Sequence, residues 1–475
     1  MTSLLARPAK RLRVPPRYLA LLFLPLAVPG RAAPPAPSWQ AGAAAVDITP
    51  DGPVWQAGFA KRAGPSQGVA LPIHAKALAL ADGGGARVVI VTLDLVGIPL
   101  PLREKVAQEA ARRYRLPPES LLLNSSHTHS APALSREEVE VTGFYGYKPA
   151  DPVYADRAEA YLPVVEEKTI QVIGQALANL QPATLDYTHA HAGFAMNRRL
   201  HVGTTVRHEA SPDGPVDPDV PVLRVSGADG RVRAILFGYA CHNTAVTGAV
   251  CLINGDYAGY AQVDLEKEHP GAVALFVQGA AGDQNPYPRG TLEYAARFGR
   301  SLADAVDAAL SVSVLRPVAG PLRTALGHAQ LAYAEDSRAD LERRLQSSDK
   351  MARVRAAAWL KQLDATGKLP TSYPCPVQVI RFGTDLLLVA VGGEPTVEYS
   401  LRLKRELAGG PAAVWFAGYS NDVFGYLGSR QVLIEGGYEG YDTNVDSARH
   451  PGPYALSIED RVVGEVYDLI RETNH

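Results

Sequence analysis

The sequence predicts an α/β fold in which a large mixed, mostly parallel β-sheet core is covered by helices within a single catalytic domain. Two observations carry this prediction. Hydrophobic residues make up 47% of the 475 residues and charged residues 20%, which is enough apolar side chain for a sizeable core. Short runs rich in Val, Ile, Leu and Phe are apolar on consecutive positions, which is typical of strands buried on both faces, and helical patterns lie between them.

Six such apolar runs follow one another along the chain, and each leads into a loop dense in polar residues. In chain order they are 86–95, 120–129, 233–244, 272–286, 385–396 and 412–422. The polar residues at their ends are Asp94, His127, His129, His242, Asp283, Glu394, Asn421 and Asp422. Because ligands of such sheets bind beyond the carboxyl ends of the strands, these ends predict one shared buried site.

Two segments carry helical patterns. Ile170, Ile173, Leu177 and Leu180 follow 3-4-3 spacing, which predicts a helix. Residues 340–363 predict a long charged amphipathic helix or a helix pair. We expect this segment to be a helical insertion on the rim of the fold, at about 335–365.

The first 33 residues have the order of a secretory signal. A basic head precedes the apolar segment Leu19–Val28, and small residues follow near Ala32 and Ala33. An uncleaved anchor is the alternative, but the segment is short for a membrane span and Pro25 interrupts it, which favours cleavage. We therefore expect a signal peptide at 1–33, a mature domain at 34–475, and a secreted or periplasmic location.

Charge and cysteine content exclude some classes of protein. The formal net charge of −2 gives no reason to expect a nucleic-acid partner. Three cysteines, Cys241, Cys251 and Cys375, are too few for a disulfide scaffold, although Cys241 and Cys251 could pair in an exported chain. No CxxC motif is present, which excludes cysteine-based zinc binding.

His127, His129, His242 and Glu394 are candidate ligands of a zinc ion. Zinc takes about four ligands from His, Asp, Glu and Cys, and a catalytic site keeps one position for water. His127 and His129 are two positions apart, so on an extended segment they point to the same side. Taken singly, each histidine also fits a structural or loop role, and Glu394 fits a carboxylate at a helix N-terminus. Residue types alone leave both interpretations open.

Other motifs of hydrolysis and nucleotide binding do not match. The sequence has no GxSxG, which excludes a nucleophile elbow. His208-Glu209 lacks the second histidine of HExxH, and the Gly-rich stretch 279–283 lacks the GK[ST] of a phosphate-binding loop.

Several ordered blocks resemble the neutral/alkaline ceramidases, a family of zinc-dependent amidases that cleave the N-acyl bond of ceramide. The blocks are AVDITPDGP, IHAKALAL, NSSHTHSAP, MNRR, ACHNTAVTG with LINGDYAGYA, GGEPT, and NDVFGY with GGYEG. The resemblance implies that the zinc ligands are His127, His242, Glu394 and Tyr426. It further implies that His129 lies beside the metal for proton transfer or oxyanion binding, and that Arg198 and Tyr438 belong to the catalytic site. The implied substrate is a small-molecule acyl amide or lipid, while peripheral membrane contact and oligomeric state stay open.

The sequence departs from the family pattern in two ways. Asn285 stands in GDQNPYP where the family shows a serine in its GD-x-S-P-N block, and an asparagine cannot act as that nucleophile. The chain stops at His475, so we expect no C-terminal immunoglobulin-like domain of the kind that longer relatives carry.

The resulting prediction is an exported zinc-dependent hydrolase that cleaves an N-acyl amide bond with metal-activated water, a route that does not need the missing serine. Asp94, Asp256 and Asp283 are expected either to orient the imidazoles or to cap loops. Two alternatives stay open. One is a metal-binding scaffold that has lost catalysis, which the asparagine at 285 favours, and the other is a hydrolase of a different acyl substrate, an ester or an N-acyl amino sugar.

Overall fold

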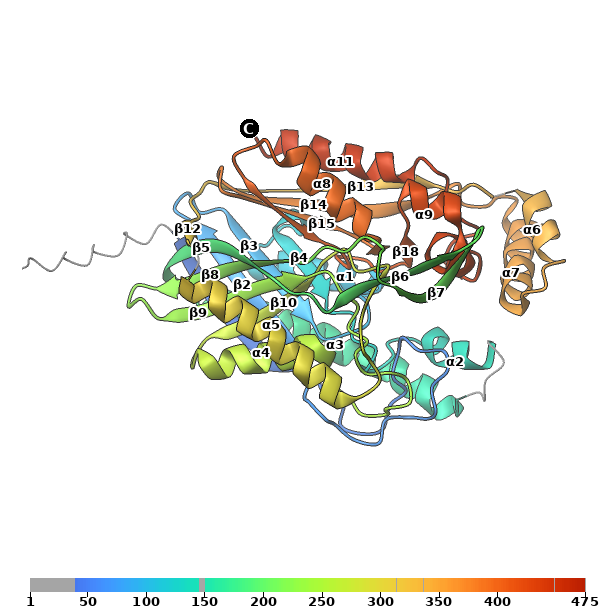
Figure 1. The fold of residues 1–475 in the computed structure, drawn as a ribbon, viewed down its shortest axis with the longest axis horizontal. Coiled ribbons are helices and arrows are strands. Elements are labelled where there is room, and N and C mark those ends of the chain that lie inside the picture. Colours follow the sequence, from blue (N-terminus) through green and yellow to red (C-terminus); the bar gives the residue numbers. More distant parts are fainter. Residues whose placement is uncertain (1–38, 145–149, 313, 336, 448, 475) are drawn as a thin grey trace, which may run out of the picture. The chain divides into compact units, whose positions relative to one another are not determined.

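A nine-stranded and a four-stranded β-sheet pack face to face in the computed structural model, which describes residues 39–144, 150–312, 314–335, 337–447 and 449–474 (Figure 1). The expected signal peptide, 1–33, lies outside the described residues. Leu80 and Ile90 of the larger sheet and Ile380 and Trp415 of the smaller one contribute to the apolar layer between the sheets. Helices cover both outer faces, so the described part has four layers: helix, sheet, sheet, helix.

The larger sheet has the strand order β10-β9-β8-β5-β1-β2-β3-β4, and the short strand β12 pairs with β5 outside this path. Its strands are β1 (Trp39–Asp47), β2 (His74–Asp82), β3 (Arg87–Leu93), β4 (Leu121–Ser125), β5 (Gln181–His191), β8 (Asp219–Gly227), β9 (Val232–Tyr239), β10 (Val273–Gln278) and β12 (Arg316–Pro317). The smaller sheet has the order β13-β14-β15-β17, with β13 (Leu322–Ala332), β14 (Ser372–Phe382), β15 (Leu386–Val391) and β17 (Ala413–Ala417).

Two further short sheets carry residues of the site. One has the order β11-β6-β7, with β6 (Ala195–Val202), β7 (Thr205–Ser211) and β11 (Gln284–Pro286). The other pairs β16 (Glu394–Pro395) with β18 (Tyr426–Leu427).

The mixed α/β sheet covered by helices is confirmed, but the expected predominance of parallel pairing is wrong. All six predicted apolar runs form strands, and they pair in parallel with one another: β3 with β4, β9 with β10, and β15 with β17. Every other pairing within the two large sheets of the described chain is antiparallel. The strands that make only antiparallel pairs have mixed apolar and polar sequences, such as QPATLDYTHAH in β5, and therefore lack the continuous apolar signal.

Six helices form the two outer layers. Helices α1 (Leu100–Tyr114), α3 (Pro152–Ala178), α4 (Asp256–Glu268) and α5 (Leu292–Val312) cover the larger sheet, and α8 (Val397–Leu407) and α11 (Ile458–Glu472) cover the smaller one. Three of the four residues of the predicted 3-4-3 pattern lie on α3, where Ile170 and Ile173 are buried and Leu177 packs beside them. Leu180 lies two residues beyond the end of the helix and packs against the same cluster. Asp151 starts this helix because its side chain accepts a hydrogen bond from the Val153 N–H.

The charged segment near residue 350 forms a helix pair, α6 (Arg338–Arg344) and α7 (Lys350–Thr366), which stands to one side of the sheets in Figure 1. Ser337 and Asp340 form a capping box at the start of α6, and the Asp349 side chain caps α7. A new N-cap at Asp349 requires non-helical backbone there, which divides the segment into two helices.

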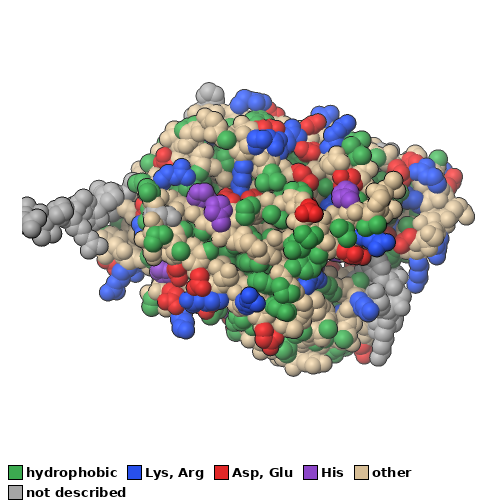
Figure 2. Space-filling model, in the orientation of Figure 1, with side chains coloured by type: hydrophobic (Ala, Val, Ile, Leu, Met, Phe, Trp, Pro, Cys, Tyr) green, Lys and Arg blue, Asp and Glu red, His purple; other side chains and the backbone are tan. Residues whose placement is uncertain are grey.

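All three cysteines are buried free thiols, so the pairing of Cys241 with Cys251 that the sequence left open is not formed. No helix among the described residues is long and apolar enough to cross a membrane. On the face drawn in Figure 2, basic and acidic side chains are interspersed, in keeping with the net charge of −2.

Candidate metal centre

The carboxyl ends of the parallel strands meet at one place, as the polar strand ends predict. The side chains brought there from both sheets are His127, His129, His242 and Glu394, and we call this set the histidine–glutamate centre. Buried Asn124, at the end of β4, helps to join the two sheets. Its Nδ2 donates to the Gly418 carbonyl at 2.7 Å, and its Oδ1 accepts from the Gln278 N–H at 2.8 Å.

The four side chains of the centre place their metal-binding atoms close to one another. Nε2 of His127 lies 3.1 Å from Nε2 of His242, 3.0 Å from Nε2 of His129 and 3.2 Å from Oε2 of Glu394. Oε2 of Glu394 also lies 3.5 Å from Nε2 of His242. Tetrahedral ligands held at ~2.0–2.1 Å from zinc lie about 3.3 Å apart, so these separations fit the coordination sphere of one ion.

Hydrogen bonds on the far side of two rings determine which nitrogen carries the proton. Nδ1 of His127 donates to the Val96 carbonyl, and Nδ1 of His242 donates to the Ala281 carbonyl at 2.6 Å. A carbonyl oxygen only accepts, so in the neutral rings Nε2 is left with a lone pair. Two lone pairs and a carboxylate oxygen therefore face one another in a buried place, which is unfavourable without positive charge between them.

Interactions with His127 and His242 keep Glu394 ionised. Burial raises the pKa of this carboxyl, but the imidazoles of His127 and His242 outweigh burial and lower the pKa well below its usual value. Glu394 is therefore an anion at neutral pH, which is the form that binds a metal.

Tyr426 reaches the centre through strand pairing. β16 and β18 pair in parallel with Glu394 opposite Tyr426, and the Tyr426 hydroxyl lies 3.5 Å from Nε2 of His242. Nη2 of Arg198 donates to that hydroxyl oxygen at 2.8 Å. The metal-binding atoms of His127, His242 and Glu394 thus lie within 3.5 Å of one another, and the Tyr426 hydroxyl joins them through its contact with His242.

His129 lies beside the centre in a tightly packed position. Its ring meets the Phe59 ring edge-on at 4.7 Å between centroids, and a side chain at Gly58 (φ +91°) would collide with it. Burial lowers the pKa of His129 well below its usual value, and the neighbouring imidazoles of His127 and His242 lower it further. Its Nδ1 is buried and has no hydrogen-bond partner among the described residues.

Asn285 lies next to Arg198. Its Oδ1 accepts from Nη1 of Arg198 at 3.2 Å and from the Thr244 hydroxyl at 3.1 Å. Its Nδ2 is buried and has no partner in the described part of the chain. Asn285 therefore offers unused N–H groups at the position where the resemblance implies a hydroxyl.

Tyr438 completes the set of predicted site residues. Its ring centroid lies 5.4 Å from that of Tyr426, and the guanidinium of Arg198 lies 5.5 Å from the Tyr426 centroid and 5.9 Å from the Tyr438 centroid. Tyr438 is 42% exposed whereas Tyr426 is buried, so part of the Tyr438 side chain is accessible to solvent. The structure therefore brings the residues implied by the resemblance close to one another: His127, His129, Arg198, His242, Asn285, Glu394, Tyr426 and Tyr438.

Glu439 holds Arg198 in place and was not predicted. It lies in the π-helix η2 (Tyr438–Asp442), is 1% exposed, and accepts from Nε of Arg198 at 2.9 Å and from Nη1 of Arg199 at 2.8 Å. Burial raises its pKa, but a hydrogen bond with His208 and the two arginines outweigh burial and lower the pKa to about 2. The arginines and Glu439 are 240 or more positions apart, so no local pattern reveals the contact.

Tyr419 was also missed. Its ring centroid lies 4.6 Å from that of His127, and its buried hydroxyl has no partner among the described residues. His127, Tyr419 and Asn421 all have positive φ, at 64°, 50° and 64°. Non-glycine residues rarely adopt this conformation, and such strain concentrates at functional sites.

The three aspartates cap loops and do not orient the imidazoles. Asp94 accepts from the His74 N–H, Asp256 accepts from the N–H groups of Ala245 and Val246, and Asp283 accepts from the Val397 N–H. Backbone carbonyls instead hold the rings of His127 and His242. Of the two roles considered for these carboxylates, loop capping is the one the hydrogen bonds support.

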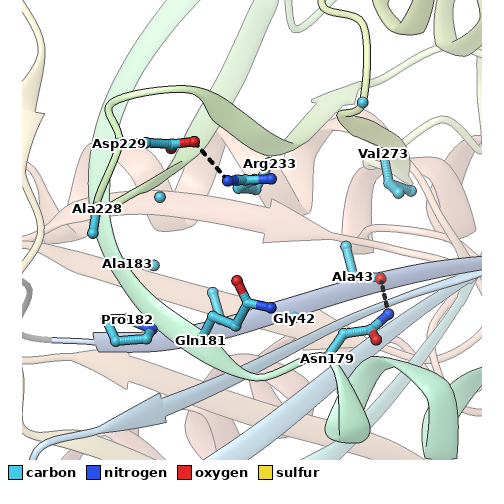
Figure 3. Close-up of a pocket in the computed structure, with 13 residues that line it drawn as sticks. Gly42, Ala43, Asn179, Gln181, Pro182, Ala183, Ala228, Asp229, Arg233 and Val273 are labelled. Carbon is cyan, nitrogen blue, oxygen red and sulfur yellow. Dashed lines mark hydrogen bonds and ion pairs between the residues drawn. The ribbon is translucent and has the colours of Figure 1, made fainter.

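Two cavities lie at opposite ends of the strands. One, of about 320 Å³, reaches the centre and is lined at its inner end by His127 and Glu394. The other, of about 400 Å³, is shown in Figure 3 and is lined by residues at the starts of β5 and β10, including Gln181 and Val273. No residue of the centre lines this second cavity, where Arg233 pairs with Asp229, so the chemistry belongs to the first.

Four layers of helix and sheet, with a buried histidine–glutamate centre at the carboxyl ends of parallel strands, define the class: an α/β protein with a candidate metal centre. A family model described as neutral/alkaline non-lysosomal ceramidase, N-terminal, matches residues 39–297, which is more than half of the chain. The chain belongs to this family, which confirms the resemblance. His127, His129, Arg198, His242 and Asn285 lie within the matched range, and Glu394, Tyr426 and Tyr438 lie beyond it.

Individual relatives agree with the family. The neutral ceramidase of Mycobacterium tuberculosis is 24% identical over 438 residues, covering 76% of this chain and 66% of that protein, just under two thirds of its length. The crystal structure of neutral ceramidase from Pseudomonas aeruginosa matches with a TM-score of 0.70 and 21% identity, over 92% of this chain and 75% of the other. A structure of ceramidase complexed with C2 matches with a TM-score of 0.68 and 21% identity, over 92% and 76% of the two chains. These structural likenesses establish the fold.

Proposed function

We propose that the chain is an exported, zinc-dependent hydrolase that cleaves the N-acyl amide bond of ceramide or a ceramide-like substrate. Family membership and the names of the relatives support an amide substrate, and the structure of ceramidase complexed with C2 supports a lipid one. The observation that carries the proposal is the convergence of two imidazole lone pairs, a carboxylate and a phenol on one buried point. Export rests on the basic head and apolar segment of residues 1–33.

The donor set fits zinc. His127, His242, Glu394 and Tyr426 would hold the ion with two nitrogens and two oxygens, which are ligands that zinc accepts. Zinc in such a site supplies a Lewis acid that activates water and polarises a carbonyl oxygen. The Val96 and Ala281 carbonyls fix the ring orientations from behind, as outer partners of metal-binding histidines do.

The remaining side chains serve proton transfer and charge stabilisation. Nε2 of His129 faces the centre, where its ring can take a proton from the attacking water and return it to the leaving amine. Four of the five N–H groups of Arg198 donate hydrogen bonds to Glu439, Asn285, Tyr426 and the Gly282 carbonyl. The main role of Arg198 is therefore to position these groups. The Tyr438 hydroxyl and the unused Asn285 N–H groups are then the donors for the charge that develops on the carbonyl oxygen. One such donor is typically worth ~10²–10³ in rate.

Metal analysis and substrate profiling test the proposal together. We expect the purified protein to contain about one zinc per chain and to release fatty acid from an N-acyl amide. His242→Ala should lose both the zinc and the activity, because one ligand of the ion is removed. His269→Ala is the matched control, since His269 bonds to Asp307 outside the centre.

Two outcomes contradict the proposal. Unchanged zinc content in His242→Ala would show that the ligand set is wrong. A zinc-loaded protein that is inactive on amides would contradict the amidase function. The panel of test substrates therefore also includes an ester and an N-acyl amino sugar, to identify another hydrolase. Inactivity on the whole panel would favour the metal-binding scaffold.

A further inference from the structure

Arg62 is a buried arginine next to the histidine–glutamate centre. It is 6% exposed, and the charges that act on it in the described part of the chain include no carboxylate. Burial lowers the pKa of Arg62 to about 10, so the guanidinium is still charged at neutral pH. A buried cation without an ionic partner is costly unless its N–H groups are satisfied. The hydrogen bonds of Arg62 therefore indicate its role.

These hydrogen bonds go to carbonyl oxygens in and around the segment that carries His129. Nη2 of Arg62 donates to the His129 carbonyl at 2.5 Å and to the Ala57 carbonyl at 3.2 Å. Nη1 donates to Oε1 of Gln56 at 3.1 Å, and Nε2 of Gln56 donates in turn to the Ser130 carbonyl at 3.0 Å. The two side chains together therefore bind the carbonyls of two consecutive residues. Hydrogen bonds from a charged donor are stronger than neutral ones, so the His129 carbonyl is firmly held.

Arg62 also contacts the aromatic ring that packs against His129. The guanidinium carbon of Arg62 lies 5.5 Å from the centroid of the Phe59 ring, a distance at which a cation is attracted to an aromatic face. The Phe59 ring in turn meets the His129 ring edge-on at 4.7 Å between centroids. Arg62 thus binds the backbone of His129 and packs on the aromatic neighbour of its imidazole.

The His129 ring depends on these contacts because it lacks a hydrogen bond that the other two imidazoles have. Nδ1 of His127 and Nδ1 of His242 each donate to a backbone carbonyl, which fixes the orientation of the ring. Nδ1 of His129 is buried and has no partner among the described residues. The orientation of the His129 ring therefore depends on its backbone and on its packing, and Arg62 contributes to both.

Small displacements of His129 are expected to be costly. Its Nε2 lies 3.0 Å from Nε2 of His127. A group that transfers a proton must come within about 2.6–3.2 Å of the atom that it serves. A misplacement of about 1 Å can lower the rate of a reaction ~10²-fold. A side chain that holds His129 can therefore control the rate without touching the substrate.

We propose that Arg62 is a positioning residue, which holds the His129 carbonyl and the Phe59 ring and thereby aims Nε2 of His129 at the histidine–glutamate centre. This inference rests on the proposed function, because the position of His129 affects catalysis only if His129 transfers a proton there. Arg62 does not line the cavity that reaches the centre. It therefore acts through His129 and not on the substrate.

A double-mutant cycle with His129 tests the inference on the zinc-loaded protein, with ceramide as substrate. Arg62→Met keeps the length of the side chain and removes its N–H groups. We expect it to lower kcat ~10²-fold with little change in KM and in zinc content, because the four zinc ligands are all retained. In a His129→Ala background the same substitution should change kcat by less than about 2-fold, because the side chain through which Arg62 acts is gone. Equal losses in the two backgrounds would overturn the positioning role.

Two further variants complete the cycle. Arg62→Lys covers the case that the methionine variant does not fold. A lysine keeps the charge but lacks the planar fork that serves several acceptors, so we expect a smaller loss of kcat that also disappears in the His129→Ala background. Arg103→Met is the matched control, because Arg103 is also 6% exposed and donates to two backbone carbonyls and one side-chain amide outside the centre. Its effect on kcat should be the same in both backgrounds.

Hydrogen exchange separates the inference from the proposed function. The N–H groups of His129 and Ser130 are both hydrogen-bonded in the folded protein. We expect Arg62→Met to speed the exchange of these two amides about 5-fold or more, and Arg103→Met to leave their exchange unchanged, as measured by mass spectrometry. Faster exchange in a protein that cleaves no amide would support the hold on His129 and refute the proposed function. Unchanged exchange would refute the hold of Arg62 on His129, whether or not the protein cleaves amides.

Discussion

At the residue scale, Asn285 is the side chain whose role differs most from the family pattern. Its Nδ2 is buried beside Arg198 and has no partner among the residues that the structure describes, which costs stability unless the group serves a ligand. We predict that Asn285→Ala lowers kcat ~10²-fold with little change in KM, because the lost donor acts on charge that exists only in the transition state. Steady-state kinetics on the best amide of the panel measure this effect.

The control for that experiment is Asn179→Ala, because Asn179 donates to the Ala43 carbonyl in the distant cavity of Figure 3. An Asn285→Ala variant with the kcat of the wild type would show that the unused amide serves packing alone. Asn285→Ser restores a hydroxyl donor, and we expect it to keep more activity than the alanine variant.

Glu439 makes the stability of the protein depend on acid in a predictable direction. Its pKa is lowered from 4.5 to about 2 in the folded protein, so its stabilising contribution is present above pH 4.5 and is lost as the pH falls toward 2. We predict that the free energy of unfolding falls by about 1 kcal/mol more in the wild type than in Glu439→Gln between pH 5.5 and pH 3.5. Urea unfolding at the two pH values measures the difference. Glu209→Gln changes an exposed glutamate and should follow the wild type, and equal pH slopes for all three proteins would refute the prediction.

The site residues differ in how strongly the sequence around them indicates a functional role. His127, His129, His242 and Glu394 were found because each follows an apolar run, and that position is visible in the chain itself. Tyr426, Arg198 and Tyr438 needed the family blocks, since tyrosine and arginine are common and have no spacing relative to the histidines. Glu439 and Tyr419 were missed because their partners lie hundreds of positions away.

At the element scale, the short strand β16 is positioned by a close approach of backbone. A Cβ on Gly282 would lie 2.6 Å from the Glu394 carbonyl oxygen and 2.8 Å from that of Pro395, and the Gly282 carbonyl accepts from Arg198. We predict that Gly282→Ala displaces β16, lowers the free energy of unfolding by ~1–3 kcal/mol as overpacking does, and reduces the zinc content. Denaturation and metal analysis of the purified variant test both effects.

Gly409→Ala is the matched control for this substitution, because nothing lies within 4 Å of a Cβ built there. If Gly282→Ala were to bind zinc normally and unfold like the control, the Gly282 contact would not determine the position of Glu394.

The sequence predicted the strands whose residues are apolar at consecutive positions, because such runs are typical of strands buried on both faces. Six strands carry continuous apolar runs, and these six pair in parallel. Strands such as β1, with the sequence WQAGAAAVD, are stabilised by pairing with strands that lie far away in the sequence. Their own residues therefore give only a weak signal of a strand.

At the scale of the whole molecule, the centre connects the two sheets. His127 and His242 follow strands of the larger sheet, while Glu394 and Tyr426 follow strands of the smaller one. The apolar layer between the sheets brings these ends into register, and hydrogen bonds such as those of Asn124 hold them there. A metal ion bound at the centre would therefore link both halves of the fold.

This link predicts that chelation destabilises the entire protein. An ion that binds only the folded state at a free concentration 100 times its Kd adds about 2.7 kcal/mol to the free energy of unfolding. For a chain of this size, at ~2.1 cal/mol/K of unfolding entropy per residue, its removal should lower Tm on the order of 3 °C, measured by calorimetry with and without dipicolinate. His242→Ala should show no further decrease with chelator, because its centre has lost a ligand. An equal decrease of Tm in wild type and variant would mean that the metal binds elsewhere. No decrease of Tm in the wild type would mean that metal binding at the centre does not stabilise the fold.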